Sequence, residues 1–186
     1  ERFLPEFEKA EQEFGVPKEI IAAIIGIESS YGSITGRERV IDSLSTLAFD
    51  YPRRSKFFTK QLEHFLLLTR EEKLDPLVMK GSYAGAMGYG QFIPSSYRSY
   101  AIDFDDDGIR NIVTNPIDAI GSVANYLSKH GWERNAKIAE SLTKNDVNSN
   151  FKTSLSLKEP DALELASKIN LPNKKYLQIN FEDKEF

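Results

Sequence analysis

One glutamate stands out because a helix would bury it. Between Lys18 and Ser29, isoleucines recur at helical spacing and predict a helix with a wide apolar face. Glu28 follows Ile21 by seven residues and Ile24 by four, so a continuous helix places its carboxyl group on that face. Burial favours the protonated form of a carboxyl group, which a general acid needs. Glu28 is therefore the first candidate for a catalytic residue.

The alternative interpretation of Glu28 is structural. A glutamate at a helix end can be partly exposed, or it can pair with Arg37 or Arg39, and such ion pairs also perturb carboxylates. Taken alone, the pattern favours this second interpretation, so other motifs have to decide.

A segment rich in glycine and alanine spans residues 81–90 and lets the backbone approach another group closely. Tyr83 and Tyr89 add rings that suit the apolar faces of sugars, and Gln91 can both donate and accept hydrogen bonds. The alternative is a tight turn beside the core. A phosphate loop is excluded because no Gly-Lys-Ser/Thr sequence follows.

The acidic run at 103–109 has the opening of an EF-hand loop, with carboxylates at positions one, three and five and then a glycine. Position twelve is Thr114, where the usual glutamate belongs. Flexible loops of oxygen ligands favour Ca²⁺ over Mg²⁺. We expect a structural Ca²⁺ here and no organic cofactor.

Several segments together resemble one family. Gly26-Ile27-Glu28-Ser29-Ser30-Tyr31-Gly32 resembles the Glu-Ser catalytic motif of lysozyme-like lytic transglycosylases. The segments 50–54, 81–97 and 118–126 resemble, in the same order, the membrane-bound lytic murein transglycosylase B family. The resemblance covers roughly residues 14–132.

This resemblance implies a glycan-cleaving lyase with a lysozyme-like helical core. Such an enzyme cleaves the β-1,4 bond between N-acetylmuramoyl and N-acetylglucosaminyl residues of peptidoglycan. By resemblance, Glu28 protonates the glycosidic oxygen and then deprotonates the sugar's own 6-hydroxyl, which gives a 1,6-anhydromuramoyl end. The implied partners are glycan strands, peptide stems and other cell-wall enzymes. The implied location is the periplasm of a Gram-negative bacterium, with an outer-membrane anchor in the full-length protein.

By resemblance, Ser82 and Gln91 line the cleft near Glu28, and Ser82 orients the acetamido group of the N-acetylmuramoyl residue. Tyr126 is placed there too, although a core tyrosine on an amphipathic helix is an equal interpretation from the sequence. The resemblance also extends the acidic loop to 103–118. Its implied metal ligands are Asp103, Asp105, Asp107, Ile109 through its carbonyl, and Asp118.

Two arginines, Arg53 and Arg54, follow a Tyr-Pro turn. Guanidinium groups bind carboxylates well, so both could bind the acidic peptide stems of peptidoglycan. A solvated surface pair is the alternative, which the pattern alone favours.

A hydrolase with two carboxylates would need a second acid beside Glu28. Asp42 fits a helix N-cap and Asp50 fits a turn before Tyr51-Pro52, so neither is a convincing partner. This agrees with a mechanism that uses one carboxyl group. Two alternatives stay open: a hydrolytic muramidase that uses water at Glu28, and a peptidoglycan-binding scaffold without catalytic activity.

Composition excludes other classes of protein. The 186 residues include 24 basic and 28 acidic ones without a basic stripe, which argues against binding to nucleic acid. The absence of cysteine excludes a disulfide framework and thiolate metal sites. The longest apolar stretch, Ile20–Ile27, is too short to span a bilayer. The first residue is Glu1 rather than Met, which favours a processed or trimmed chain.

The elements that must position these residues are mainly helical. Helices are predicted over 3–14, 18–29, 41–49, 55–72 and 116–130, with another that begins near 94. Alternation at 177–181 predicts a strand. The expected fold is mainly α (α+β), with a helical catalytic region at 1–132 and a smaller mixed α/β tail lobe at 133–186, which is incomplete if the chain is truncated.

Overall fold

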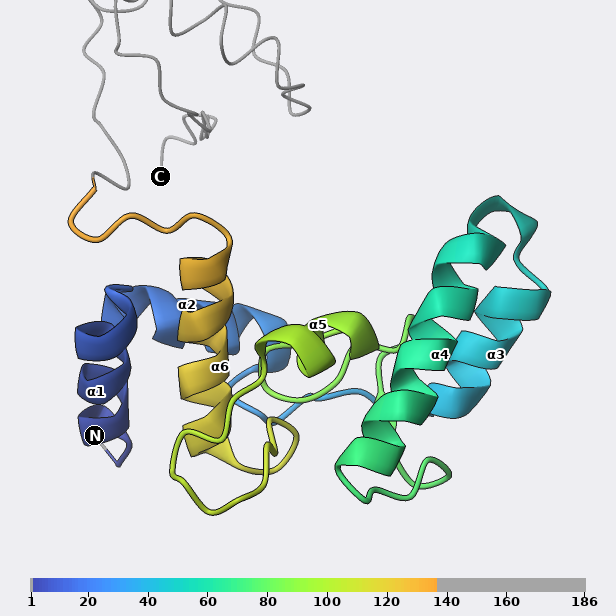
Figure 1. The fold of residues 1–186 in the computed structure, drawn as a ribbon, viewed down its shortest axis with the longest axis horizontal. Coiled ribbons are helices and arrows are strands. Elements are labelled where there is room, and N and C mark those ends of the chain that lie inside the picture. The colour runs from blue at the N-terminus through green and yellow to red at the C-terminus, as the bar shows by residue number, and fades with distance from the viewer. Residues whose placement is uncertain (1, 137–186) are drawn as a thin grey trace, which may run out of the picture. The chain divides into compact units, whose positions relative to one another are not determined.

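The structure is a computed structural model that describes residues 2–136 of the chain. Within these residues the helices are α1 (Leu4–Phe14), α2 (Lys18–Ser29), α3 (Val40–Phe49), the 3-10 helix η1 (Pro52–Arg54), α4 (Ser55–Glu71), α5 (Pro94–Tyr100) and α6 (Pro116–Lys129) (Figure 1). Two short strands, β1 (Glu38–Arg39) and β2 (Lys80–Gly81), pair antiparallel. The mainly helical fold is confirmed. The predicted strand at 177–181, and the tail lobe apart from residues 133–136, lie outside the described residues.

Local sequence sets the helix ends. Gly15 ends α1 in a left-handed conformation at φ 73°, which glycine adopts without a steric penalty. Asn115 caps α6, because its side chain accepts a hydrogen bond from the backbone N–H of Ile117, and Pro116 occupies the first helical position. These residues determine where α1 ends and where α6 begins.

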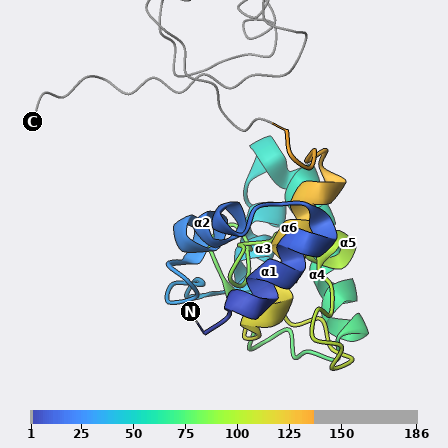
Figure 2. The same cartoon turned by 90° about the vertical axis from the view of Figure 1, so that its left-hand side faces the viewer.

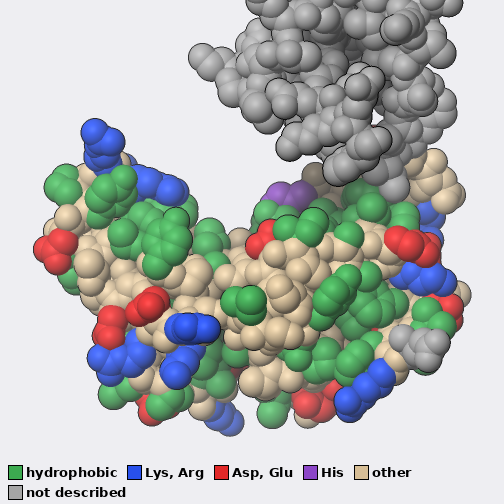
Figure 3. Space-filling model, turned by 180° about the vertical axis from the view of Figure 1, so that it is seen from behind, with side chains coloured by type: hydrophobic (Ala, Val, Ile, Leu, Met, Phe, Trp, Pro, Cys, Tyr) green, Lys and Arg blue, Asp and Glu red, His purple; other side chains and the backbone are tan. Residues whose placement is uncertain are grey.

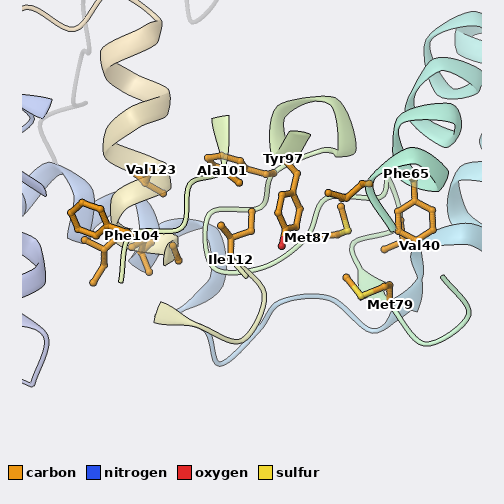
Figure 4. Close-up of a cluster of buried hydrophobic side chains, with 14 of the residues drawn as sticks. Val40, Phe65, Met79, Met87, Tyr97, Ala101, Phe104, Ile112 and Val123 are labelled. Carbon is orange, nitrogen blue, oxygen red and sulfur yellow. The ribbon is translucent and has the colours of Figure 1, made fainter. Parts of the chain in front are cut away.

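The helices form two groups. α1, α2 and α6 pack on one another, whereas α3 and α4 form a hairpin, and α5 contacts both α4 and α6 (Figures 1 and 2). One row of buried side chains joins the groups, from Phe104 and Val123 through Ile112, Tyr97 and Met87 to Val40, Phe65 and Met79 (Figure 4). The loops between α4 and α6 therefore belong to the core.

Tyr97 lies in the middle of this row. Its hydroxyl donates a 2.7 Å hydrogen bond to the carbonyl of Arg110, and burial raises the pKa of Tyr97 to about 12. The hydrogen bond gives the buried hydroxyl a partner and fixes α5 to the loop before α6.

An ion pair joins α4 to α5 at the surface. Arg98 donates to both carboxylate oxygens of Glu71, at 2.9 and 2.7 Å, and this bonding lowers the pKa of Glu71. Because the folded-state pKa is depressed, the pair stabilises the fold above the unfolded pKa and loses its effect as pH falls through the folded value. We expect the difference in unfolding free energy between wild type and Glu71→Gln to shrink as pH is lowered from 7 to 3 in urea titrations. A constant difference would contradict this assignment.

Candidate active site

Glu28 lies in the last turn of α2, and its side chain is exposed. The predicted burial is wrong, because the buried face of α2 runs through Ile21, Ile25 and Ser29 at a spacing of four. Glu28 precedes Ser29, so it is rotated by roughly 100° from that face. Within residues 2–136 its carboxylate makes no hydrogen bond or ion pair, so the group is accessible to a ligand.

The alternative interpretation of Glu28 is confirmed in part: the residue lies at the helix end and is exposed, but among residues 2–136 it forms no ion pair with Arg37 or Arg39. Arg39 pairs with Asp42, with 2.6 Å between Nε and Oδ2. Asp42 lies in the first turn of α3 after the cap residue Arg39, so the predicted N-cap role is wrong as well. Asp42 is thus occupied by a surface ion pair.

Ser29 attaches the end of α2 to the glycine-rich segment. Its side chain is 1% exposed, and its hydroxyl lies 3.0 Å from the carbonyl of Ile25 and 2.8 Å from that of Tyr89. The same oxygen accepts a 3.0 Å hydrogen bond from the N–H of Gly32. Ser29 belongs to the Glu-Ser motif, but no role was predicted for it, because the motif does not indicate the bond to Tyr89.

Ser82, in the glycine-rich segment, and Gln91, directly after it, both make hydrogen bonds to backbone groups. The Ser82 hydroxyl accepts from the N–H groups of Ala84 and Ala86, at 3.3 and 3.1 Å. The Gln91 amide donates to the carbonyls of Gly88 and Thr35, at 2.9 and 3.2 Å. These bonds shape the segment and tie it to the chain that follows α2.

The tyrosines of this segment differ in exposure. Tyr83 is 79% exposed, whereas Tyr89 is half-buried, with its ring against Gly32. Any larger residue at Gly32 would overlap the ring. Tyr89 therefore lies beside the turn that follows Glu28, and Tyr83 presents its ring to solvent.

Tyr126 of α6 belongs to an aromatic cluster with Phe92, Tyr100 and His130. Its ring centroid lies 5.4 Å from that of Phe92, 5.2 Å from that of Tyr100 and 4.0 Å from that of His130. Phe92 follows Gln91 and exchanges backbone hydrogen bonds with Met87. The half-buried Tyr126 is therefore linked to the glycine-rich segment through Phe92.

Arg53 and Arg54 lie on η1, which packs on α3 and α4. Both are exposed, and the Arg54 guanidinium lies 4.4 Å from the ring centroid of Phe57. Figure 3 shows Lys and Arg side chains at the top of the α3–α4 part, and a hollow between that part and the rest of the described protein.

The acidic loop brings Asp103, Asp105 and Asp107 together, with one carboxylate oxygen of each within 4.8 Å of the others. Asp103 accepts hydrogen bonds from the N–H groups of Asp107 and Gly108, at 3.0 and 2.7 Å. The loop turns through Gly108 at φ 89°. Three converging carboxylates repel each other unless a cation neutralises them, so this donor set fits a hard divalent ion.

Asp118 is fully buried, at 0% exposure, and lies outside this group of three. One oxygen accepts from the N–H of Phe104 at 2.8 Å, and the other from the N–H of Asn111 at 2.7 Å. Burial raises the pKa of Asp118 despite these hydrogen bonds. The side chain therefore joins the first turn of α6 to Phe104 and Asn111 of the loop. Ile109 donates its N–H to Asp107 at 2.8 Å.

No helix in residues 2–136 combines the length and the apolar character that crossing a membrane requires.

The family model described as "Transglycosylase SLT domain" matches residues 2–179, so the chain belongs to that family. Over 131 residues it is 55% identical to the membrane-bound lytic murein transglycosylase B of Escherichia coli (strain K12), a match that covers 70% of this chain and 36% of the relative. The resemblance inferred from the motifs is confirmed. The chain spans only about a third of that relative's length.

Solved structures agree with this assignment. The Escherichia coli lytic transglycosylase Slt35 in complex with calcium is 52% identical, with a TM-score of 0.71, over 73% of this chain and 43% of that chain. SltB3 of Pseudomonas aeruginosa in complex with NAG-anhNAM-pentapeptide is 40% identical, with a TM-score of 0.69, over 73% of this chain and 36% of that one. The described helices therefore have the fold of lytic transglycosylases.

Proposed function

We propose that this chain carries the catalytic region, residues 1–132, of a peptidoglycan lytic transglycosylase. Its reaction cleaves the β-1,4 bond between N-acetylmuramoyl and N-acetylglucosaminyl residues and forms a 1,6-anhydromuramoyl product. The observation that carries this proposal is the position of Glu28, an accessible carboxyl group whose neighbour Ser29 is held to the glycine-rich segment. Membership of the transglycosylase family supplies the class of reaction.

In the proposed mechanism one carboxyl group acts twice. Glu28 donates its proton to the glycosidic oxygen as the bond between that oxygen and C1 breaks. The resulting carboxylate then takes the proton of the 6-hydroxyl of the same muramoyl residue while that oxygen bonds to C1. Glu28 ends protonated and no water is consumed, so no second carboxylate is required.

Substrate binding is assigned to residues around this acid and on the α3–α4 hairpin. Tyr83, Tyr89 and Tyr126 offer aromatic surface to sugar rings, and Ser82 and Gln91 offer polar groups. Arg53 and Arg54 would bind the carboxylates of peptide stems. The complex of SltB3 with NAG-anhNAM-pentapeptide supports peptide recognition in a relative.

The location follows from the same proposal. A protein that cuts peptidoglycan acts in the cell envelope, and we place this one in the periplasm of a Gram-negative bacterium. An outer-membrane anchor in the full-length protein is part of the proposal, because the relative from Escherichia coli is named membrane-bound. Other cell-wall enzymes are proposed as partners.

The function is tested by digesting purified peptidoglycan sacculi with the full-length protein. Mass spectrometry of the released muropeptides should find 1,6-anhydromuramoyl ends. Reducing ends in their place would identify a hydrolytic muramidase. Binding to sacculi without any release would identify a scaffold.

For the acidic loop we propose a structural Ca²⁺ held by Asp103, Asp105 and Asp107, with the Ile109 carbonyl and Asp118 as further ligands. The convergence of three carboxylates supports it, as does the calcium named for the relative Slt35. An ion that binds only the folded state stabilises it by about 2.7 kcal/mol at 100 times its Kd. We therefore expect Ca²⁺ to raise the Tm relative to EGTA in thermal unfolding.

Substitutions separate this effect from nonspecific screening. Asp107→Asn should abolish the rise in Tm, whereas Asp106→Asn should keep it, because Asp106 lies outside the group of three. Mg²⁺ should stabilise the protein less than Ca²⁺. Equal Tm values in Ca²⁺ and EGTA would contradict the proposed site.

A further inference from the structure

The backbone that follows the candidate acid is held in an unfavourable conformation. Ser30, Tyr31 and Gly32 are all left-handed, with φ of 49°, 56° and 83°. Glycine adopts this region freely, but a bulky residue such as tyrosine does so rarely. Such a conformation persists only when the surrounding structure imposes it, and it gathers at functional sites.

In this conformation the Tyr31 N–H bonds to the carbonyl of Ile25 at 3.3 Å, and the Tyr31 ring lies against Gly26 of α2. A Cβ atom added to Gly26 would lie 2.8 Å from Cζ of the Tyr31 ring and 2.9 Å from its hydroxyl oxygen. Only glycine at position 26 lets the ring lie against the helix. Glycine inside a helix is itself unfavourable. A glycine inside a helix and a left-handed tyrosine are each unfavourable for folding. The contact between Gly26 and the Tyr31 ring accounts for both.

The other end of the segment is fixed as well. Gly32 lies against the Tyr89 ring, and its N–H donates to the Ser29 hydroxyl. The N–H of Ser30 bonds to the carbonyl of Gly26 at 3.0 Å. In the sequence, Glu28 therefore lies between Gly26, which contacts the Tyr31 ring, and Gly32, which contacts the Tyr89 ring.

We propose that Tyr31, seated on Gly26, is a positioning residue for Glu28. Gly26 and Glu28 are two residues apart on α2, so they face directions roughly 200° apart. The Tyr31 ring thus lies on the flank opposite the carboxylate and acts on it through the backbone. Tyr31 is 68% exposed, so it adds little to the core. This inference rests on the proposed function.

Two substitutions in the full-length protein test the proposal. Gly26→Ala displaces the ring, and Tyr31→Gly removes it while it relieves the left-handed conformation. We expect each to lower kcat about tenfold, because small displacements of a catalytic group are costly, and to leave KM unchanged. The Tm should stay the same or rise, because alanine favours the helix and glycine favours the turn. Tyr31→Phe, which keeps the ring, should have the kcat of the wild type.

Lys73→Gly is the matched control, because Lys73 is exposed and left-handed at φ 55° after the end of α4. It should keep kcat. An unchanged kcat in Gly26→Ala and Tyr31→Gly would overturn the proposal, as would a rise in KM alone or a fall in Tm that accompanies the loss of activity.

The exchange rates of backbone amides test the proposal independently of enzymatic activity. The amides of Tyr31, Gly32 and Ile34 donate to the Ile25 carbonyl, the Ser29 hydroxyl and the Ser29 carbonyl. They should exchange faster in both variants than in wild type, and unchanged exchange would overturn the role of the ring. If wild type forms no anhydro ends, the proposed function fails, while exchange still reports whether the ring fixes this segment.

Discussion

Glu28→Gln should lower the release of 1,6-anhydromuramoyl ends from sacculi about a thousandfold or more. General acid–base catalysis contributes roughly 10²–10⁴-fold, and in the proposed mechanism the same carboxyl group performs both proton transfers. Because Glu28 is exposed and unpaired within residues 2–136, the substitution should change the free energy of unfolding by less than about 0.5 kcal/mol. Quantitative mass spectrometry of muropeptides measures the release, and cosedimentation with sacculi should find binding retained.

Glu19→Gln provides the control, since Glu19 is an exposed glutamate in the first turn of the same helix. It should keep wild-type activity. Full activity in Glu28→Gln would remove Glu28 from the mechanism.

Asp118→Ala is expected to destabilise the fold by about 3 kcal/mol. The substitution leaves two N–H groups, of Phe104 and Asn111, without their carboxylate acceptor. Hydrogen bonds to a charged group contribute roughly 1.5–3 kcal/mol each, and a buried donor without a partner carries a desolvation penalty. Urea unfolding in EGTA measures the loss apart from any bound cation.

Asp106→Ala separates a loss of negative charge from a loss of these hydrogen bonds. Asp106 is exposed in the same loop, so its removal should change the free energy of unfolding by no more than about 0.5 kcal/mol. Equal effects of the two substitutions would show that the Asp118 hydrogen bonds do not stabilise the loop.

The sequence predicted the helices well because apolar periodicity records which face is buried. The predicted burial of Glu28 was wrong, because the isoleucines of α2 form a broad apolar face of which only part is buried. The buried part runs through Ile21, Ile25 and Ser29. The role of Ser29 was beyond local patterns, because its partner Tyr89 lies 60 residues away. The strands β1 and β2 have two residues each, which is too short for any alternation to be visible.

Among the candidate site residues, the acidic loop was the most readable. Its spacing of alternate aspartates led to the cluster that the structure places together. The hydrogen bonds of Asp118, Ser82 and Gln91 to the backbone were not visible, because a bond between a loop side chain and a backbone group leaves no periodic signal in the sequence. Their substrate or metal roles remain predictions.

The row of buried side chains between the two helix groups has a mechanical consequence. Met87, Tyr97 and Ile112 fill the region that a hinge would have to open, and close-packed interiors resist deformation. The packing therefore resists a change in the separation of the two helix groups, which lie on either side of the hollow in Figure 3. A ligand bound between the two groups would therefore have to fit the separation that this packing sets, through its own conformation and through movements of surface side chains.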